Sequence, residues 1–204
     1  MKVTISIAKF LKSSDSVFNK LIEKYGLLET HSSFDLFSSF VFHFIGQMLS
    51  NKVADVLWTR FVNLVGEVEP HNILNVPDDK IRNIGISRAK IEFIKSFCND
   101  IINKKIVLDS LNSLSDDELI RTLTKIKGVG EWTAEMIALF SLGRENIFSF
   151  KDVALKRGIM KCHPNFKTLS KTRFKKLRKL YSPYCSYASL YFYKVNDDPN
   201  FILD

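Results

Sequence analysis

A glycine turn between two helical patterns is the stretch of this sequence best suited to chemistry. Residues 123–134 read Leu-Thr-Lys-Ile-Lys-Gly-Val-Gly-Glu-Trp-Thr-Ala, so Gly128 and Gly130 enclose the small apolar Val129. Glycines let the backbone turn sharply and leave its N–H groups uncovered. At the start of the next helix those groups favour an anion, because the helix dipole is positive there. The turn therefore predicts a phosphate site. A corner in which the glycines serve only for turning is the alternative.

The charge of the chain also favours a polyanionic partner. Its 204 residues carry a formal net charge of +8, and Lys125 and Lys127 lie within the turn segment, which suits a nucleic-acid phosphate. A denser basic run follows later in the chain, at Lys167, Lys171, Arg173, Lys175, Lys176, Arg178 and Lys179. This run either contacts phosphates or forms a solvated helix face, and the sequence leaves both interpretations open.

Helical patterns fill most of the chain and must position these residues. Hydrophobic residues make up 46% of the sequence, as in globular proteins. The run from Phe34 to Leu49 is apolar nearly all round and predicts a buried central helix, with polar Gln47 and Ser50 where it emerges. Residues 53–65 predict an amphipathic helix, whereas residues 3–10 alternate loosely and predict a short extended segment. The predicted fold class is all-α.

Further helix starts lie on either side of the glycine turn. Residues 115–118, Ser-Asp-Asp-Glu, form a capping-box pattern before it. After a helix at 132–142 and a loop at 144–150, Asp152 begins another helix at 153–161. Asp is common at helix N-caps, so a purely structural role is one interpretation of Asp152.

The cysteines and histidines predict neither disulfides nor a metal site. The three cysteines are far apart and show no CxxC spacing: Cys98, Cys162 and Cys185. The four histidines show no metal-ligand spacing either: His31, His43, His71 and His163.

No apolar run is long enough to span a membrane, and the first eight residues are too short and polar for a secretory signal. We expect no cofactor and a cytoplasmic, nucleoid-associated location in a prokaryote or a nuclear one in a eukaryote.

Four short motifs follow one another along the chain. They are Ile-Gly-Gln-Met-Leu-Ser at 45–50, Ile-Gly-Ile-Ser-Arg-Ala-Lys at 84–90, Lys-Gly-Val-Gly-Glu-Trp-Thr-Ala at 127–134 and Ser-Pro-Tyr-Cys-Ser-Tyr-Ala at 182–188. In the same order they resemble the motifs of the helix-hairpin-helix (HhH-GPD) DNA glycosylases, 3-methyladenine DNA glycosylase II branch. A lone GxG turn is a weak signal, but four motifs in order are a strong one.

The resemblance implies two helical lobes with a DNA-binding and active-site cleft between them. It covers roughly residues 12–195 of what we expect to be a single glycosylase unit, 1–204. The expected lobes are about 34–115 and 116–165, and the helices of the two chain ends, 1–33 and 166–204, complete the second lobe. Lys127, Phe150 and Cys185 replace residues common in the family, but none of them removes a reacting group.

By this resemblance, Asp152 falls at the spacing of the family's catalytic aspartate. Breaking an N-glycosidic bond builds positive charge on the sugar, and a buried carboxylate near C1′ stabilises that charge. In bifunctional relatives a lysine stands two residues after the second hairpin glycine and forms a Schiff base with the sugar. Trp132 stands there in this chain, which predicts hydrolysis without strand cleavage.

The resemblance also implies a base pocket and a wedge. After flipping, the target base would stack against Trp132 and Tyr193, with Met136 as the floor, and electron-rich rings favour a cationic alkylated purine. The alternative is that Trp132 and Tyr193 are core aromatics. Gln47 or Met48 would fill the vacated stack, unless the segment is an ordinary helix end.

The function predicted on these grounds is a monofunctional DNA glycosylase of base-excision repair that removes alkylated purines of the 3-methyladenine type. The alternatives are a glycosylase for an oxidised, deaminated or bulky base, and a non-catalytic DNA-binding module. The expected partner is double-stranded DNA containing a damaged base, and the protein is expected to be a monomer.

Hairpin carbonyls in this family often hold a structural monovalent cation. The expected DNA contacts are Gln47, Met48, Ser50, Lys127, Gly128, Val129, Gly130 and Thr133.

Overall fold

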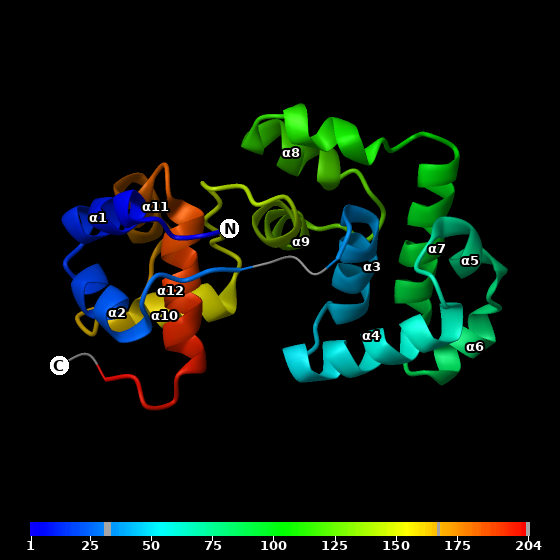
Figure 1. Ribbon diagram of the computed structural model, residues 1–204, viewed down its shortest axis with the longest axis horizontal. Helices are drawn as coiled ribbons and strands as arrows, with labels where there is room; N and C mark the ends of the chain where they lie inside the picture. Colours follow the sequence, from blue (N-terminus) through cyan, green and yellow to red (C-terminus); the bar gives the residue numbers. More distant parts are fainter. Residues whose placement is uncertain (31–33, 167, 203–204) are drawn as a thin grey trace. The chain divides into compact units, whose positions relative to one another are not determined.

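The computed structural model describes residues 1–30, 34–166 and 168–202, and it is built from helices (Figure 1). No β-strand occurs in these residues, and an isolated bridge joins Lys2 to Glu29. The all-α class predicted from the sequence is confirmed. The chain divides into two compact units, called here unit 1 (Met1–His31 with Gly143–Asp204) and unit 2 (Ser32–Leu142).

Unit 2 is one continuous segment with a buried central helix. Its α-helices are α3 (Leu36–Gly46), α4 (Asn51–Val65), α5 (Pro70–Asn75), α6 (Asp78–Asn83), α7 (Arg88–Ile102), α8 (Asp116–Leu123) and α9 (Glu131–Met136). A 3-10 helix, η1 (Leu108–Ser113), and a π-helical turn, η2 (Ile137–Ser141), complete it. Phe40 and Phe44 of α3 are fully buried, and Phe40 stacks on Phe97 of α7 with ring centroids 4.8 Å apart. The buried central helix is therefore confirmed.

The glycine turn joins α8 to α9 within unit 2. The capping box predicted before it is present, because the Ser115 hydroxyl accepts from the Glu118 N–H and the Glu118 carboxylate accepts from the Ser115 N–H. The helix after the turn packs back on its own unit, since α9 continues into η2 and η2 contacts α3. Residues 116–142 therefore group with residues 34–115, whereas the expected lobes had separated them.

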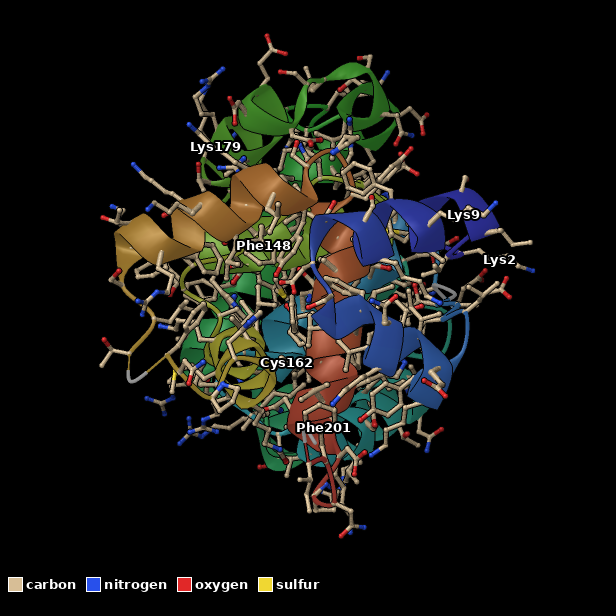
Figure 2. The ribbon with its side chains drawn as sticks, turned by 90° about the vertical axis from the view of Figure 1, so that its left-hand side faces the viewer. Lys2, Lys9, Phe148, Cys162, Lys179 and Phe201 are labelled. Atoms are coloured by element: carbon tan, nitrogen blue, oxygen red, sulfur yellow. The ribbon has the colours of Figure 1, made fainter. Side chains whose placement is uncertain are left out.

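Unit 1 is assembled from both ends of the chain. Its helices are α1 (Ile5–Ser14), α2 (Val17–Tyr25), α10 (Val153–Cys162), α11 (Lys171–Tyr181) and α12 (Cys185–Asp197). Figure 2 shows α12 in the middle of this unit, with α1 and α2 on one side and α10 on the other. Two buried tyrosines tie the ends together: Tyr181 donates to Asp15 at 2.7 Å, and Tyr191 donates to the Gly26 carbonyl at 2.8 Å.

The extended segment expected at residues 3–10 is wrong, because most of this stretch is the helix α1. The hydroxyl of Thr4 caps the helix by accepting a hydrogen bond from the Ile7 N–H at 3.3 Å. Ile7, Ala8 and Leu11 are buried, and their spacing is that of one helical face. In the described residues, no helix is both long and apolar enough to cross a membrane.

Candidate active site

Asp152 is a buried carboxylate at the start of α10 in unit 1. The residue is 3% exposed, and its Oδ1 accepts a hydrogen bond from the Leu155 N–H at 2.7 Å, as an N-cap does. Its Oδ2 accepts one from the hydroxyl of Tyr193 on α12 at 3.3 Å. The N-cap interpretation therefore accounts for Oδ1 alone, because the donor to Oδ2 comes from a second helix, α12. Burying a carboxylate costs free energy that an exposed cap avoids.

A close contact between α10 and α12 places these two groups. Gly158 of α10 faces α12, and a Cβ at this position would overlap the carbonyl oxygen of Phe192. Only glycine lets the two backbones approach so closely. Phe192 directly precedes Tyr193, so this close approach and the Tyr193–Asp152 hydrogen bond join the same two helices.

The loop that leads to Asp152 is held by Ser186 of the C-terminal motif. The buried Ser186 hydroxyl accepts a hydrogen bond from the Ile147 N–H at 2.9 Å and donates one to the Arg144 carbonyl at 2.5 Å. In addition, the Ser186 N–H donates to the Glu145 carbonyl at 2.9 Å. These bonds fix the loop to the first turn of α12, which gives the motif serine a physical role.

The two glycines of the turn in unit 2 have different surroundings. Gly128 has φ +84°, in the left-handed region, and a Cβ there would overlap the ring of Phe93 on α7. Gly130 has φ −82° and ψ 172°, which any residue adopts, and a Cβ there would meet nothing within 4 Å. The fold itself therefore requires glycine at 128 but not at 130. Between them, Val129 is buried and its N–H donates to the Ile126 carbonyl at 3.0 Å.

Gln47 ties the end of α3 to the glycine turn. Its side-chain amide donates to the Gly128 carbonyl at 2.8 Å and to the Thr133 hydroxyl at 3.4 Å. Thr133 is itself 5% exposed, so its side chain is part of this internal link. The structure thus brings together three of the predicted DNA-contact residues, and it engages the side chains of two of them in support of the turn.

Met48 lies next to the half-buried Gln47 but is itself exposed. It is 98% exposed and has φ +59°, a backbone conformation uncommon for a residue other than glycine. The hydroxyl of Ser50 then caps α4 by accepting from the Val53 N–H at 3.4 Å. Met48 thus combines an exposed apolar side chain with an uncommon backbone conformation, and such a combination indicates a functional role.

Trp132 and Met136 lie one turn apart on α9. Trp132 is 37% exposed, whereas Met136 is 4% exposed. The π-helical turn η2 follows directly, and such turns are frequent at functional sites. Of the predicted pocket residues, Trp132 and Met136 belong to unit 2, and Tyr193 belongs to unit 1 with Asp152.

Two lysines of the predicted motifs have partners that the sequence pattern does not reveal. The ammonium group of Lys127 pairs with Glu92 of α7 at 2.5 Å, and both side chains are more than half exposed. The ammonium group of Lys90, in the second motif, donates to the Ile45 carbonyl at 2.8 Å. Burial lowers the pKa of Lys90. Lys90 thus supports the end of α3, from which Gln47 and Met48 emerge.

Four carbonyl oxygens of the turn accept hydrogen bonds within the protein. The Leu123 carbonyl accepts from the Ile126 N–H, the Ile126 carbonyl from the Val129 N–H and the Gly130 carbonyl from the Ala134 N–H. The Gly128 carbonyl accepts from the side-chain amide of Gln47. A cation at any of these four oxygens would share it with that donor, and the cation remains an expectation of the resemblance. Among the described side chains, no group of three or more His, Cys, Asp or Glu residues could hold a metal ion.

Positive charge is concentrated in unit 1. Its residues include 18 Lys and Arg against 8 Asp and Glu, a formal charge of +10, whereas unit 2 has 12 against 14, a charge of −2. The helix α11 carries six cations and no carboxylate. Arg173 donates to the Thr168 carbonyl at 2.9 Å, and Lys167 lies outside the described residues, as does His31.

Comparison with known proteins identifies the family of this chain. The family model described as the HhH-GPD superfamily of base excision DNA repair proteins matches residues 41–183. The chain belongs to this superfamily. DNA-3-methyladenine glycosylase 1 of Schizosaccharomyces pombe is 30% identical over 154 residues, which cover 74% of this chain and 68% of that protein.

Two solved structures are similar over nearly the whole chain. A DNA-3-methyladenine glycosidase from Bacillus halodurans is 31% identical with a TM-score of 0.82, and the match covers 96% of this chain and 91% of that one. The 3-methyladenine DNA glycosylase Mag1 of Schizosaccharomyces pombe, in complex with abasic DNA, is 25% identical with a TM-score of 0.87. That match covers 97% of this chain and 100% of the other.

Proposed function

We propose that this protein is a monofunctional DNA glycosylase of base-excision repair that hydrolyses the N-glycosidic bond of alkylated purines, of the 3-methyladenine type, in double-stranded DNA. The observation that carries the proposal is the buried Asp152, held at both oxygens within a unit of net charge +10. A protein that only bound phosphate would gain nothing from a buried carboxylate. The names of the similar proteins support the substrate class.

Asp152 would act on the charge that forms as the bond breaks. The electron pair of the C1′–N bond leaves with the purine, and the sugar becomes an oxocarbenium-like cation. The fixed carboxylate stabilises this cation more than the neutral sugar, so it lowers the barrier. A water molecule then supplies an oxygen to C1′ and loses a proton. An alkylated purine is already cationic, so it leaves as a neutral base.

The glycine turn and Met48 would position the DNA. Phosphate contacts to the backbone of residues 128–133 would fix the duplex without reading sequence. Met48, exposed and apolar, would enter the stack when the damaged base is flipped out, while Trp132 and Tyr193 face the base. The hydrogen bonds of Gln47 support a role in holding the turn rather than in insertion. The protein would act as a monomer.

The product would be an intact strand with an abasic site. Trp132 stands where bifunctional relatives have the Schiff-base lysine. Lys127, which lies near this position, forms an ion pair with Glu92. Reaction with a lesion duplex should therefore give strand breaks only after alkali, and borohydride should trap no covalent complex. A trapped complex would contradict the monofunctional assignment.

The decisive experiment compares the native protein with Asp152→Asn on duplexes that contain alkylated, oxidised or deaminated bases. Asn keeps the shape and caps a helix about as well as Asp, so the melting temperature should hold. Single-turnover release of alkylated purines should fall on the order of a hundredfold or more, while lesion binding holds or tightens. Release of only another base would favour the alternative lesion, and binding without any release would favour a non-catalytic module. Full activity in Asp152→Asn would remove Asp152 from the chemistry.

A further inference from the structure

The hydroxyl of Tyr193 has a partner that a pocket wall does not need. The ring alone would suffice to stack on a base, yet the hydroxyl reaches Oδ2 of Asp152 at 3.3 Å. We propose that Tyr193 is a positioning residue, which holds the Asp152 carboxylate in the orientation that stabilises the sugar cation. This inference rests on the proposed function, because it needs Asp152 to act on the sugar.

The geometry supplies the reason for a second contact. The N-cap bond from Leu155 holds Oδ1 at 2.7 Å, but the terminal torsion of an Asp side chain has broad minima. A donor on the other oxygen therefore restricts rotation of the carboxylate plane further. Because the two donors come from α10 and α12, the carboxylate orientation follows the packing of two helices. Preorganised charge of this kind needs no rearrangement when the cation forms.

The chemical nature of the donor also matters. A phenol is neutral, so it holds the carboxylate without cancelling its negative charge, as the cation of a lysine or arginine would. The sugar cation can then use the full charge. The position of the phenol is itself fixed, because Gly158 lets α10 approach the backbone of Phe192, the residue before Tyr193.

Tyr193→Phe is the test, since it removes the hydroxyl and keeps the ring. Single-turnover base release should fall about tenfold, the scale of one hydrogen bond to a charged group, while affinity for lesion DNA stays within twofold. The matched control is Tyr25→Phe in the same unit. It removes a hydroxyl that donates to Asp198 at 2.8 Å, far along the chain from Asp152, and it should leave the rate unchanged.

A double-mutant cycle separates positioning from a direct contact with the base. In the Asp152→Asn background, with enzyme in excess and a long incubation, Tyr193→Phe should slow release less than twofold further. An equal loss in both backgrounds, or native activity of Tyr193→Phe, would overturn the inference. The proposed function fails separately, through full activity of Asp152→Asn alone. If Asp152→Asn is inactive and Tyr193→Phe behaves like the native protein, only the positioning role is lost.

Discussion

Gly128 and Gly130 are two residues apart but carry different constraints, and this difference can be measured. Gly128→Ala forces an alanine to φ +84°, which costs about 1–2 kcal/mol of stability, and the overlap with Phe93 adds to that cost. Gly130→Ala has open space and an ordinary backbone, so its melting temperature should match that of the native protein.

The same pair tests the phosphate site. A methyl group at position 130 would stand where a phosphate approaches the backbone, so Gly130→Ala should weaken binding to damaged and undamaged duplexes alike. Titrations of both duplexes with the folded variant check this expectation. If Gly130→Ala bound DNA as tightly as the native protein, the DNA phosphate would not bind at this turn.

Met48 offers a second test at a single residue. Because its side chain is almost fully exposed, Met48→Ala should not change the melting temperature. If Met48 replaces the flipped base, the variant should release a paired lesion about tenfold more slowly, but a mismatched or single-stranded lesion with little change. Ile5→Ala, at another exposed apolar residue, is the control. Equal losses on paired and single-stranded substrates would argue against a wedge.

Individual residues show what the sequence could and could not predict. The sequence alone left Asp152 as an N-cap or a catalytic group, and the structure shows the N-cap bond at Oδ1 and a second donor, the Tyr193 hydroxyl, at Oδ2. Gln47 and Met48 had equal standing as wedge candidates, since only backbone and side-chain geometry separates them. Glu92 and Phe93 were not predicted at all. Both residues contact the glycine turn from α7, about 35 residues earlier in the chain. A local sequence pattern does not predict contacts between residues so far apart.

At the scale of elements, the contact between α3 and η2 predicts a pH dependence. His43 of α3 lies 3.4 Å from the Ser141 hydroxyl of η2, and burial lowers the pKa of His43 to about 4. In the unfolded chain the pKa of histidine is about 6.5. Below that value the unfolded chain binds the proton first, so the free energy of unfolding should fall between pH 6.5 and pH 4.

Thermal unfolding across this range checks the prediction. The fall attributable to His43 should be on the order of 3 kcal/mol, and His43→Gln should make the profile shallower. Burial also lowers the pKa of His163, although Asp15 opposes the effect, so part of the slope should persist in the variant. An unchanged profile in His43→Gln would show that this contact does not control acid stability.

Helices were predictable where they were strongly apolar or began with a clear capping signal. The buried helix α3, the capping box of α8 and the start of α10 all follow from side-chain type and spacing. Residues 3–10 misled because Val3, Ile5 and Ile7 alternate, while the true buried face continues to Leu11 beyond that window. The π-helical turn at Ile137–Ser141 was not predicted, because the sequence pattern there is that of an ordinary helix.

At the scale of the whole molecule, the charge asymmetry predicts where DNA affinity originates. The cations of α11 lie in the unit of charge +10, so Lys176→Gln/Lys179→Gln should weaken binding to any duplex. The slope of log affinity against log salt should become shallower by about 1–2. The control is Lys80→Gln/Arg82→Gln in unit 2, with the same loss of charge. An identical slope in both variants would mean that α11 is a solvated face.

The division of the chain has a consequence for synthesis on the ribosome. Unit 1 needs α1 and α2 from the first 31 residues and α10 to α12 from beyond residue 143, while unit 2 is contiguous. Unit 2 can therefore fold during translation, whereas the first two helices must wait for α12 to emerge. A polypeptide released before α12 would carry the glycine turn of unit 2, but it would lack the Tyr193 donor on Asp152. Such a fragment should not release damaged bases, even where unit 2 has folded.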